Sequence, residues 1–221
     1  MSTISSITVQ NLIPQVFVGM ERTEPLCSSQ VWLRTLEFRR GDYYLVEADS
    51  GTGKSSLCSF IYGNRGDYNG RVLFDGCDVT SFSTSRWCEL RTRVIAYLPQ
   101  EMHLFPELSV MENIAIKNRL TNRRSLHWIT SMLEELEIAS KADSPAARLS
   151  VGQQQRVAVV RALCQPFDFL LIDEPVSHLD EHNNRLVASV IERTARSEGA
   201  GIIATSVGNN ILLPFNSVLK L

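Results

Sequence analysis

The sequence predicts an α/β fold: a largely parallel core sheet, a small antiparallel sheet beside it and an inserted helical lobe. Apolar runs without alternation at 167–172 and 202–205 are typical of strands covered on both faces. A short strand and an Asp-Gly turn at 71–76 favour a separate hairpin. Helical periodicity dominates the middle of the chain, from about 83 to 160, between strand–helix alternation at both ends.

We expect one domain over 1–221, with 1–82 and 161–221 forming the core and antiparallel sheet and 83–160 the helical lobe. The apolar content of 44% and charged content of 21% are ordinary for a globular protein. A net charge of −2 gives no reason to expect a nucleic-acid partner. The five scattered cysteines form no C-x-x-C pair, so we interpret them as reduced thiols, mostly in the core: Cys27, Cys58, Cys77, Cys88 and Cys164.

Local patterns assign the elements in chain order. Strands are expected at 4–18 (interrupted by Pro14), 31–39, 43–46, 71–74, 94–98, 167–172, 202–205 and 217–221. Loops or turns are expected at 19–30, 63–70 and 142–148. Helices are expected at 57–62, from Ser83 or Ser85 to Leu90, after a Ser109–Glu112 capping box, and at 125–138, 151–163 and 181–196.

One glycine-rich stretch, 47–56, joins the strand at 43–46 to the helix that follows. Glycines let backbone N–H groups converge on oxygen atoms, and the helix N-terminus adds its positive dipole end. Lys54 would reach β- and γ-phosphates, and the Ser55 hydroxyl would ligate Mg²⁺. Taken alone, the stretch is also compatible with a strand–turn–helix connection that carries a chance lysine. The predicted phosphate-contacting residues are Ala48, Asp49, Ser50, Gly51, Thr52, Gly53, Lys54, Ser55 and Ser56.

Other polar groups follow predicted strands or open helices. The strand at 167–172 ends in Asp173 and Glu174, which could hold Mg²⁺ through water and act as general base, respectively. Gln100 follows the strand at 94–98 and could ligate Mg²⁺ or hold water. Residues 149–156 open a helix with a serine cap, a second backbone anion site. Each of these three features also has a purely structural interpretation. Asp173 and Glu174 could simply end a strand at a polar turn, Gln100 could be a surface residue, and residues 149–156 could open an ordinary capped helix.

The order of these motifs resembles the ATP-binding subunit of an ABC transporter over essentially the whole chain. A Walker A-like segment at 49–56 is followed by Gln100, Leu-Ser-x-Gly-Gln at 149–153, Asp173-Glu174 and Ser-x-Leu-Asp at 177–180. The resemblance implies a P-loop NTPase (RecA-like) core with an antiparallel β subdomain and an inserted helical subdomain. It also implies an ATPase with ATP and Mg²⁺ as cofactors, paired as a homodimer or heterodimer and attached to transmembrane permease subunits on the cytoplasmic face of the membrane.

The resemblance implies residue roles as well. Residues 50–56 wrap the triphosphate, and Ser55, Gln100 and Asp173 serve the metal. Glu174 is the catalytic base, and Gln100 senses the metal and the γ-phosphate. The other half of the site comes from a second subunit: Ser150, Gly152 and Gln153 bind the γ-phosphate of the opposite ATP, and Asp180 couples the two sites.

The chain departs from the family pattern at Ala48, at Val151 and at Val207. The first two replace glycines, and Ala48 suits an ordinary negative φ. Val207 replaces a histidine that donates to the γ-phosphate, so we expect ATP binding with slow turnover. Phe17 is the candidate aromatic for stacking on adenine. The short format resembles lipoprotein-release, macrolide-efflux and cell-division subunits.

Three other functions remain to be weighed. The first is a nucleotide-gated regulatory or signalling ABC module with little hydrolysis, which Val207 favours. The second is a soluble ABC ATPase in nucleic-acid or translation work, but such proteins usually carry two cassettes or a long inserted coil. The third, a small-molecule kinase, would not need the segment 149–153.

Overall fold

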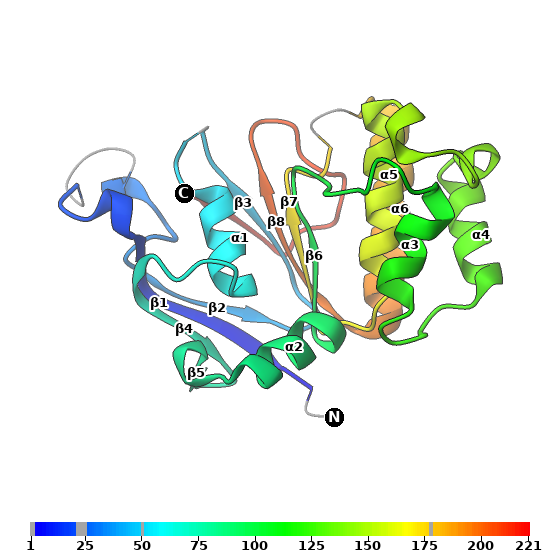
Figure 1. Cartoon of the computed structure of the whole chain (residues 1–221). Helices are drawn as coiled ribbons and strands as arrows, with labels where there is room; N and C mark the ends of the chain where they lie inside the picture. Colours follow the sequence, from blue (N-terminus) through cyan, green and yellow to red (C-terminus); the bar gives the residue numbers. More distant parts are fainter. Residues whose placement is uncertain (1–2, 21–25, 50, 177–178) are drawn as a thin grey trace.

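The computed structural model describes residues 3–20, 26–49, 51–176 and 179–221, and it contains two sheets (Figure 1). The larger has the order β6-β7-β8-β3-β9 with every neighbouring pair parallel. The smaller has the order β2-β1-β4-β5 and is antiparallel. The predicted fold class is thus confirmed. The strands are β1 Ser6–Pro14, β2 Thr35–Arg39, β3 Tyr43–Glu47, β4 Tyr68–Phe74, β5 Cys77–Asp78, β6 Ile95–Leu98, β7 Phe169–Asp173, β8 Gly201–Ser206 and β9 Ser217–Lys220.

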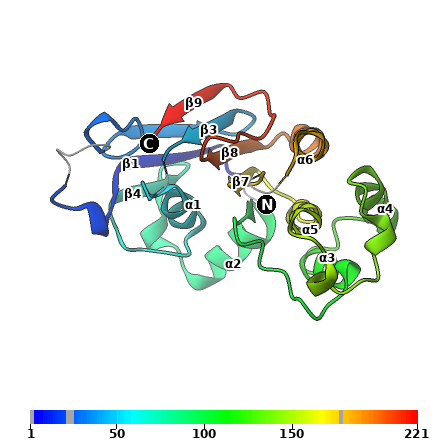
Figure 2. The same cartoon turned by 90° about the horizontal axis from the view of Figure 1, so that it is seen from above.

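The parallel sheet separates two hydrophobic cores, because successive side chains of a strand point to opposite faces. On β3, Tyr44 and Val46 join the core that contains the antiparallel sheet, whereas Tyr43 and Leu45 join the core of the helical side. Helix α1 (Lys54–Tyr62) covers the first face. Helices α5 (Val151–Leu163) and α6 (Glu181–Glu198) cover the second (Figure 2). The buried runs without alternation are explained by this double covering.

Serine caps start the lobe helices where the sequence places them. Helix α3 (Val110–Asn118) begins with the predicted capping box, in which Ser109 Oγ accepts from Glu112 N. Helix α4 (Leu126–Glu135) is capped by Ser125, whose Oγ accepts from Trp128 N. Both serines satisfy a backbone donor that has no intrahelical acceptor.

The boundary of the lobe differs from the prediction of 83–160. Helix α2 (Thr84–Arg93) and strand β6 lie within that range, yet β6 is an edge strand of the parallel sheet. Leu90 of α2 is buried in the same core as Phe74 of the antiparallel sheet. Helical periodicity reveals an apolar face but not which core that face joins, so assigning 83–98 to the lobe was wrong. We propose that the lobe starts after β6.

The predicted strand at 31–39 was wrong for its first four residues, because β2 begins at Thr35. Ser29 Oγ accepts hydrogen bonds from Val31 N at 3.1 Å and Trp32 N at 2.8 Å. Such a local turn competes with strand pairing. Leu33 then adopts a left-handed φ of 59°. The alternation here reflects a turn that buries Val31 and Trp32.

Other boundaries also moved. Strand β1 ends at Pro14 and a short helix η1 (Gln15–Phe17) follows, instead of a strand to residue 18. Helix α1 begins at Lys54, three residues before the expected 57. Strand β4 begins within the predicted turn at 63–70: a β-bulge on β1 brings Asn11 O within 2.3 Å of where a Cβ at Gly70 would lie, so only glycine fits. The remaining short helices are η2 Leu26–Ser28, η3 Val79–Ser81, η4 Ala139–Lys141 and η5 Ala146–Arg148, the last inside the predicted loop at 142–148.

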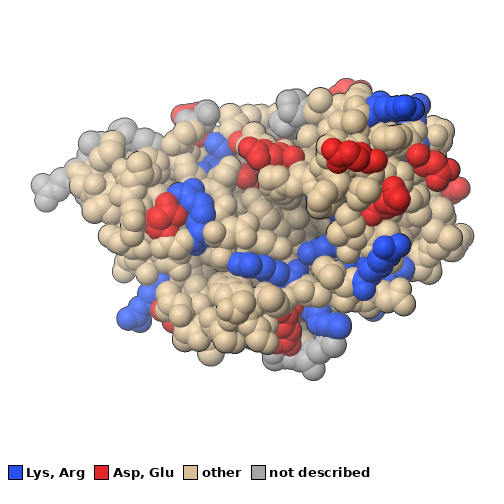
Figure 3. All heavy atoms as spheres, viewed as in Figure 1, with Lys and Arg blue, Asp and Glu red and all other residues tan. Residues whose placement is uncertain are grey.

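The face in Figure 3 carries both acidic and basic side chains and is hollowed near its middle. All five cysteines are free, as expected, but Cys27, Cys77 and Cys88 are exposed, so placing most of them in the core was wrong. Over the four described ranges, we find no helix with the length and apolar character needed to cross a membrane.

Candidate functional site

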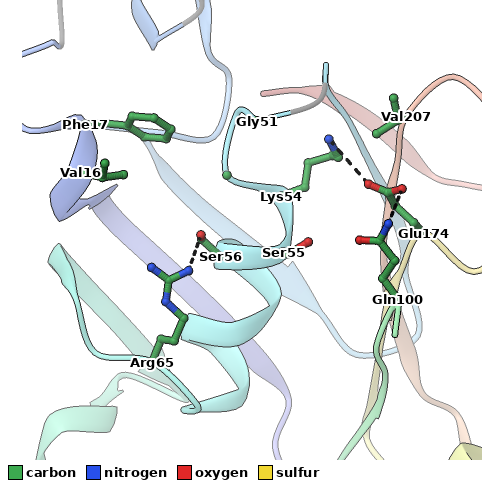
Figure 4. Close-up of a pocket in the computed structure, with 11 residues that line it drawn as sticks. Val16, Phe17, Gly51, Lys54, Ser55, Ser56, Arg65, Gln100, Glu174 and Val207 are labelled. Carbon is green, nitrogen blue, oxygen red and sulfur yellow. Dashed lines mark hydrogen bonds and ion pairs between the residues drawn. The ribbon is translucent and has the colours of Figure 1, made fainter. Parts of the chain in front are cut away.

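A pocket of about 690 Å³ lies at the N-terminus of α1, beside the carboxyl ends of the parallel strands (Figure 4). It has the size of a small-molecule site. Figure 4 shows Val16, Phe17 and Arg65 at one end, and Gln100, Glu174 and Val207 at the other. Between the two ends lie residues of the glycine-rich loop and the first turn of α1: Gly51, Gly53, Lys54, Ser55 and Ser56.

Two glycines shape the loop. Gly51 has φ +86° and Gly53 has φ +98°, values that L side chains rarely adopt. A Cβ at Gly53 would lie 3.0 Å from Trp32 Cζ2 and 3.3 Å from Phe17 Cε2. Gly53 is also the N-cap of α1 and has no side chain with which to cap it. The first N–H groups of α1 therefore remain available to an anion bound in the pocket.

Lys54 lies within this loop with only 4% of its surface exposed. Its Nζ donates to Asp49 O at 2.7 Å and to Ala48 O at 3.3 Å, and lies 3.8 Å from Glu174 Oε1. The ammonium is thus held between backbone carbonyls and a carboxylate at the middle of the pocket. Ala48 has no left-handed φ, which agrees with the expectation that a methyl is tolerated there.

The carboxylate that directly follows β7 faces this lysine. Glu174 has a left-handed φ of 48°, and its side chain is 17% exposed. Gln100 Nε2 donates to Glu174 Oε2 at 3.3 Å. Backbone strain at a non-glycine residue is common at functional sites. The geometry connects Lys54, Glu174 and Gln100 in one chain of polar contacts, and a carboxylate so placed can orient a water molecule.

Asp173 is placed differently. It is buried, with 2% exposure, and does not line the described pocket. Its Oδ1 accepts from Thr205 Oγ1 at 2.6 Å, across the β7–β8 pair. Burial, and then the Asp173 charge, raise the pKa of the neighbouring Cys58 thiol well above its ordinary value. Asp173 therefore lies behind the pocket wall, where only a water-mediated contact with a metal is compatible with the prediction.

The signature segment opens α5 away from this pocket. Ser150 and Gln153 form a reciprocal capping box, with Ser150 N donating to Gln153 Oε1 at 3.0 Å and Gln153 N to Ser150 Oγ at 3.3 Å. Val151 is 47% exposed beside them. Neither these residues nor Gly152 are among the described residues that line the pocket. Figure 1 shows that the start of α5 and the start of α1 lie at the same edge of the molecule.

Asp180 is the N-cap of α6, where its Oδ1 accepts from Asn183 N at 2.8 Å and Nδ2 at 2.9 Å. The backbone bond from Asn183 lowers the pKa of this carboxyl. It does not line the described pocket either. The predicted residues Ser50, Ser177 and His178 lie outside the described ranges.

Phe17 lines the pocket, as expected of the aromatic residue, but three contributors were missed. Val16 lies beside Phe17 and is 73% exposed. Trp32 supports the loop from behind, since its Nε1 donates to Thr52 O at 3.0 Å. Arg65 enters the pocket from the turn after α1. The Ser29 turn signal could have indicated Trp32, but no pattern marks Arg65 as a pocket residue.

A strand, a glycine-rich loop and a helix that together offer N–H groups and a lysine to an anion define a P-loop NTPase fold. The family profile described as ABC transporter matches residues 34–177, and the chain belongs to this family.

Two relatives and one solved structure show the range of similarity. The lipoprotein-releasing system ATP-binding protein of Buchnera aphidicola is 32% identical over 71% of this chain and 70% of its own length. The phosphonates import ATP-binding protein of Frankia casuarinae is 38% identical over 75% and 69%, respectively. A bacterial ABC transporter cassette in dimeric form superposes with a TM-score of 0.73 at 20% identity, covering 90% of this chain and 87% of that chain. The last comparison supports the fold alone.

Proposed function

We propose that this chain is the ATP-binding and ATP-hydrolysing subunit of an ABC transporter. One observation carries the proposal: Lys54, Gln100 and Glu174, far apart in sequence, meet in one pocket. Family membership supports it, as do relatives whose names describe ATP-binding proteins. We propose Glu174 as the general base. Gln100 would hold the Glu174 carboxylate in position and contact the γ-phosphate.

The loop residues fit a nucleotide with Mg²⁺. Residues 50–56 would wrap the phosphates, with Lys54 leaving its carbonyl acceptors to reach the β- and γ-oxygens. Hydroxyl and amide oxygens suit Mg²⁺, and Ser55 and Gln100 both line the pocket. Asp173 would act through water from behind. Bound Mg²⁺ would supply neutralisation of phosphate charge. Among the described residues, no group of three or more His, Cys, Asp or Glu side chains is arranged so that it could hold a metal ion by itself.

The remaining half of each site would come from a second ABC subunit, identical or not. Ser150, Gly152 and Gln153 lie outside the pocket of their own chain, and their helix N-terminus suits a γ-phosphate from another. Asp180 would couple the two sites. Transmembrane permease subunits would hold the pair at the cytoplasmic face of the membrane, and the relative from the lipoprotein-releasing system supports placement near that subgroup.

The test is nucleotide-dependent dimerisation of Glu174→Gln, measured by size-exclusion chromatography with ATP, with ADP and without nucleotide. We expect a dimer with ATP alone, because the substitution blocks the proposed base while keeping the side-chain shape. Lys54→Ala in the same background is the control and should remain a monomer. If Glu174→Gln binds ATP and stays monomeric, the shared-site proposal is wrong. If the Glu174→Gln protein and its Lys54→Ala control both fail to bind ATP, the assignment of the pocket as a nucleotide site is wrong as well.

A regulatory ABC module with little hydrolysis is the second candidate, because Val207 lines the catalytic end of the pocket without a donor. Phosphate release by the wild-type protein distinguishes the two. A measurable rate that Glu174→Gln abolishes supports the transporter ATPase, whereas ATP-dependent dimers without turnover support the regulatory module.

A further inference from the structure

Arg65 is the second cationic side chain in the pocket, at the end opposite Glu174 (Figure 4). It comes from the turn that follows α1, between Gly63 and the start of β4. Its Nη1 donates to Ser56 Oγ at 2.8 Å, and its guanidinium carbon lies 5.3 Å from the centroid of the Phe60 ring. Ser56 belongs to the first turn of α1, whose N–H groups form the proposed phosphate site. The guanidinium is therefore aimed at that turn.

The guanidinium retains capacity for a ligand. Two of its N–H groups are used by Asp67, from Nε at 2.9 Å and from Nη2 at 2.5 Å, and one by Ser56. A guanidinium has five such donors, so one on each terminal nitrogen remains. The side chain is 43% exposed. Both unused donors belong to a group that lines the pocket, and a planar fork suits phosphate oxygens.

The orientation of a bound nucleotide decides which of its phosphates would lie beside Arg65. Lys54 and Glu174 define the γ end, because the lysine reaches the β- and γ-phosphates and the carboxylate is the proposed base. A nucleotide extending from that end across Ser56 toward Phe17 brings its α-phosphate and sugar past Arg65. The pocket therefore has one cation for each end of the triphosphate.

We propose that Arg65 binds the α-phosphate of the nucleotide and so sets affinity for ATP and ADP alike. This rests on the proposed function. Arg65 acts in binding and not in hydrolysis, since it lies at the end of the pocket away from Glu174 and Gln100.

A purely structural role for Arg65 makes different predictions. The Arg65–Asp67 pair also stabilises its turn, and Asp67 O accepts from Gln15 N at 2.9 Å, which ties the turn to the segment that carries Phe17. If Arg65 only holds this turn, removing Asp67 should weaken nucleotide binding as well. If Arg65 binds phosphate, Asp67→Asn should strengthen binding, because the carboxylate no longer offsets the cation.

The test is calorimetric affinity for ATP and for ADP, each with Mg²⁺, using the full chain. For Arg65→Ala we expect both affinities to fall by the same factor, about 5- to 10-fold, which allows for the partial exposure of the side chain. Arg65→Lys should recover part of the loss. Asp67→Asn should tighten both ligands. Arg71→Ala is the matched control, an exposed arginine on β4 outside the pocket, and should change neither affinity.

Three results would overturn the assignment. Unchanged affinities in Arg65→Ala would exclude a phosphate contact, and a loss confined to ATP would place the contact at the γ-phosphate. Weaker binding by both Arg65→Ala and Asp67→Asn, accompanied by lower melting temperatures, would leave only the structural role. Failure of the proposed function is distinct, because the wild-type protein itself would then bind neither nucleotide.

Discussion

Replacing Val207 by histidine tests whether the lack of a hydrogen-bond donor at this position limits the rate of ATP hydrolysis. Val207 lines the end of the pocket that carries Glu174 and Gln100, and it follows β8 with 41% of its surface exposed. Valine cannot donate a hydrogen bond to a phosphate oxygen, whereas an imidazole N–H can. We therefore expect Val207→His to raise the rate of ATP hydrolysis.

The size of the gain follows from the surroundings of Val207. One positioned donor to a developing charge is worth about 10²–10³ in rate, or roughly 3–4 kcal/mol. Water competes for the donor at a position that is 41% exposed. We therefore expect a smaller gain of about 10- to 30-fold in kcat, or about 2 kcal/mol.

The assay is steady-state phosphate release by the full chain at saturating ATP and Mg²⁺. Val207→Leu is the control, since it changes the shape of the side chain without adding a donor, and it should leave kcat low. Adding Glu174→Gln to Val207→His should remove the gain, because the donor assists the same reaction. A wild-type rate that Val207→His leaves unchanged or lowers would refute the reasoning.

Substitutions at three further positions test other contacts of the fold. Trp32→Phe removes the indole donor to Thr52 O and should cost about 1–3 kcal/mol of unfolding free energy in urea, with weaker ATP binding. Asp180→Ala should cost about 1 kcal/mol by loss of the α6 cap, whereas Asp180→Asn keeps the cap and should keep the melting temperature. Burial, and then the charge of Arg161, lower the pKa of Lys117 to about 8 from 10.5, so the unfolded chain binds more protons between these values. The unfolding free energy of the wild-type protein, relative to that of Lys117→Met, should therefore rise by up to about 3 kcal/mol from pH 8 to 10.5. If the difference between the melting curves of the two proteins does not change with pH, this expectation is wrong.

Elements whose signals are local could be predicted from the sequence. The capping box at Ser109 and the Asp75–Gly76 hairpin depend on a few adjacent residues, and both are present. Both residues of that turn have positive φ, 47° and 79°, as its type requires. The run at 167–172 was recognisable as a strand covered on both faces because it lacks alternation.

Signals that depend on distant partners could not be predicted in the same way. The alternation at 31–34 has the period of a strand, but Ser29 folds it into a turn that places Trp32 under the phosphate loop. Helix α2 has an ordinary amphipathic pattern. Which hydrophobic core its apolar face joins depends on the position of distant residues such as Phe74. Arg65 lies in an unremarkable turn, and only the packing of that turn beside Ser56 brings it into the pocket. For α2 and Arg65, tertiary contacts decide the outcome, whereas at 31–34 the deciding bonds to Ser29 are local and the strand-like alternation obscures them.

The phosphate loop in this structure is held in place by bonds that a nucleotide must replace. Lys54 Nζ donates to two carbonyls of its own loop and lies 3.8 Å from Glu174, so the base and the cation partly satisfy each other. Triphosphate binding would draw Lys54 toward the phosphate oxygens and release Glu174 and Gln100, which donates to that carboxylate. We therefore expect the proposed base to lose its contact with Lys54 when a triphosphate binds. The start of α5 lies outside this pocket, so completing the site would require the Ser150 helix of a second subunit.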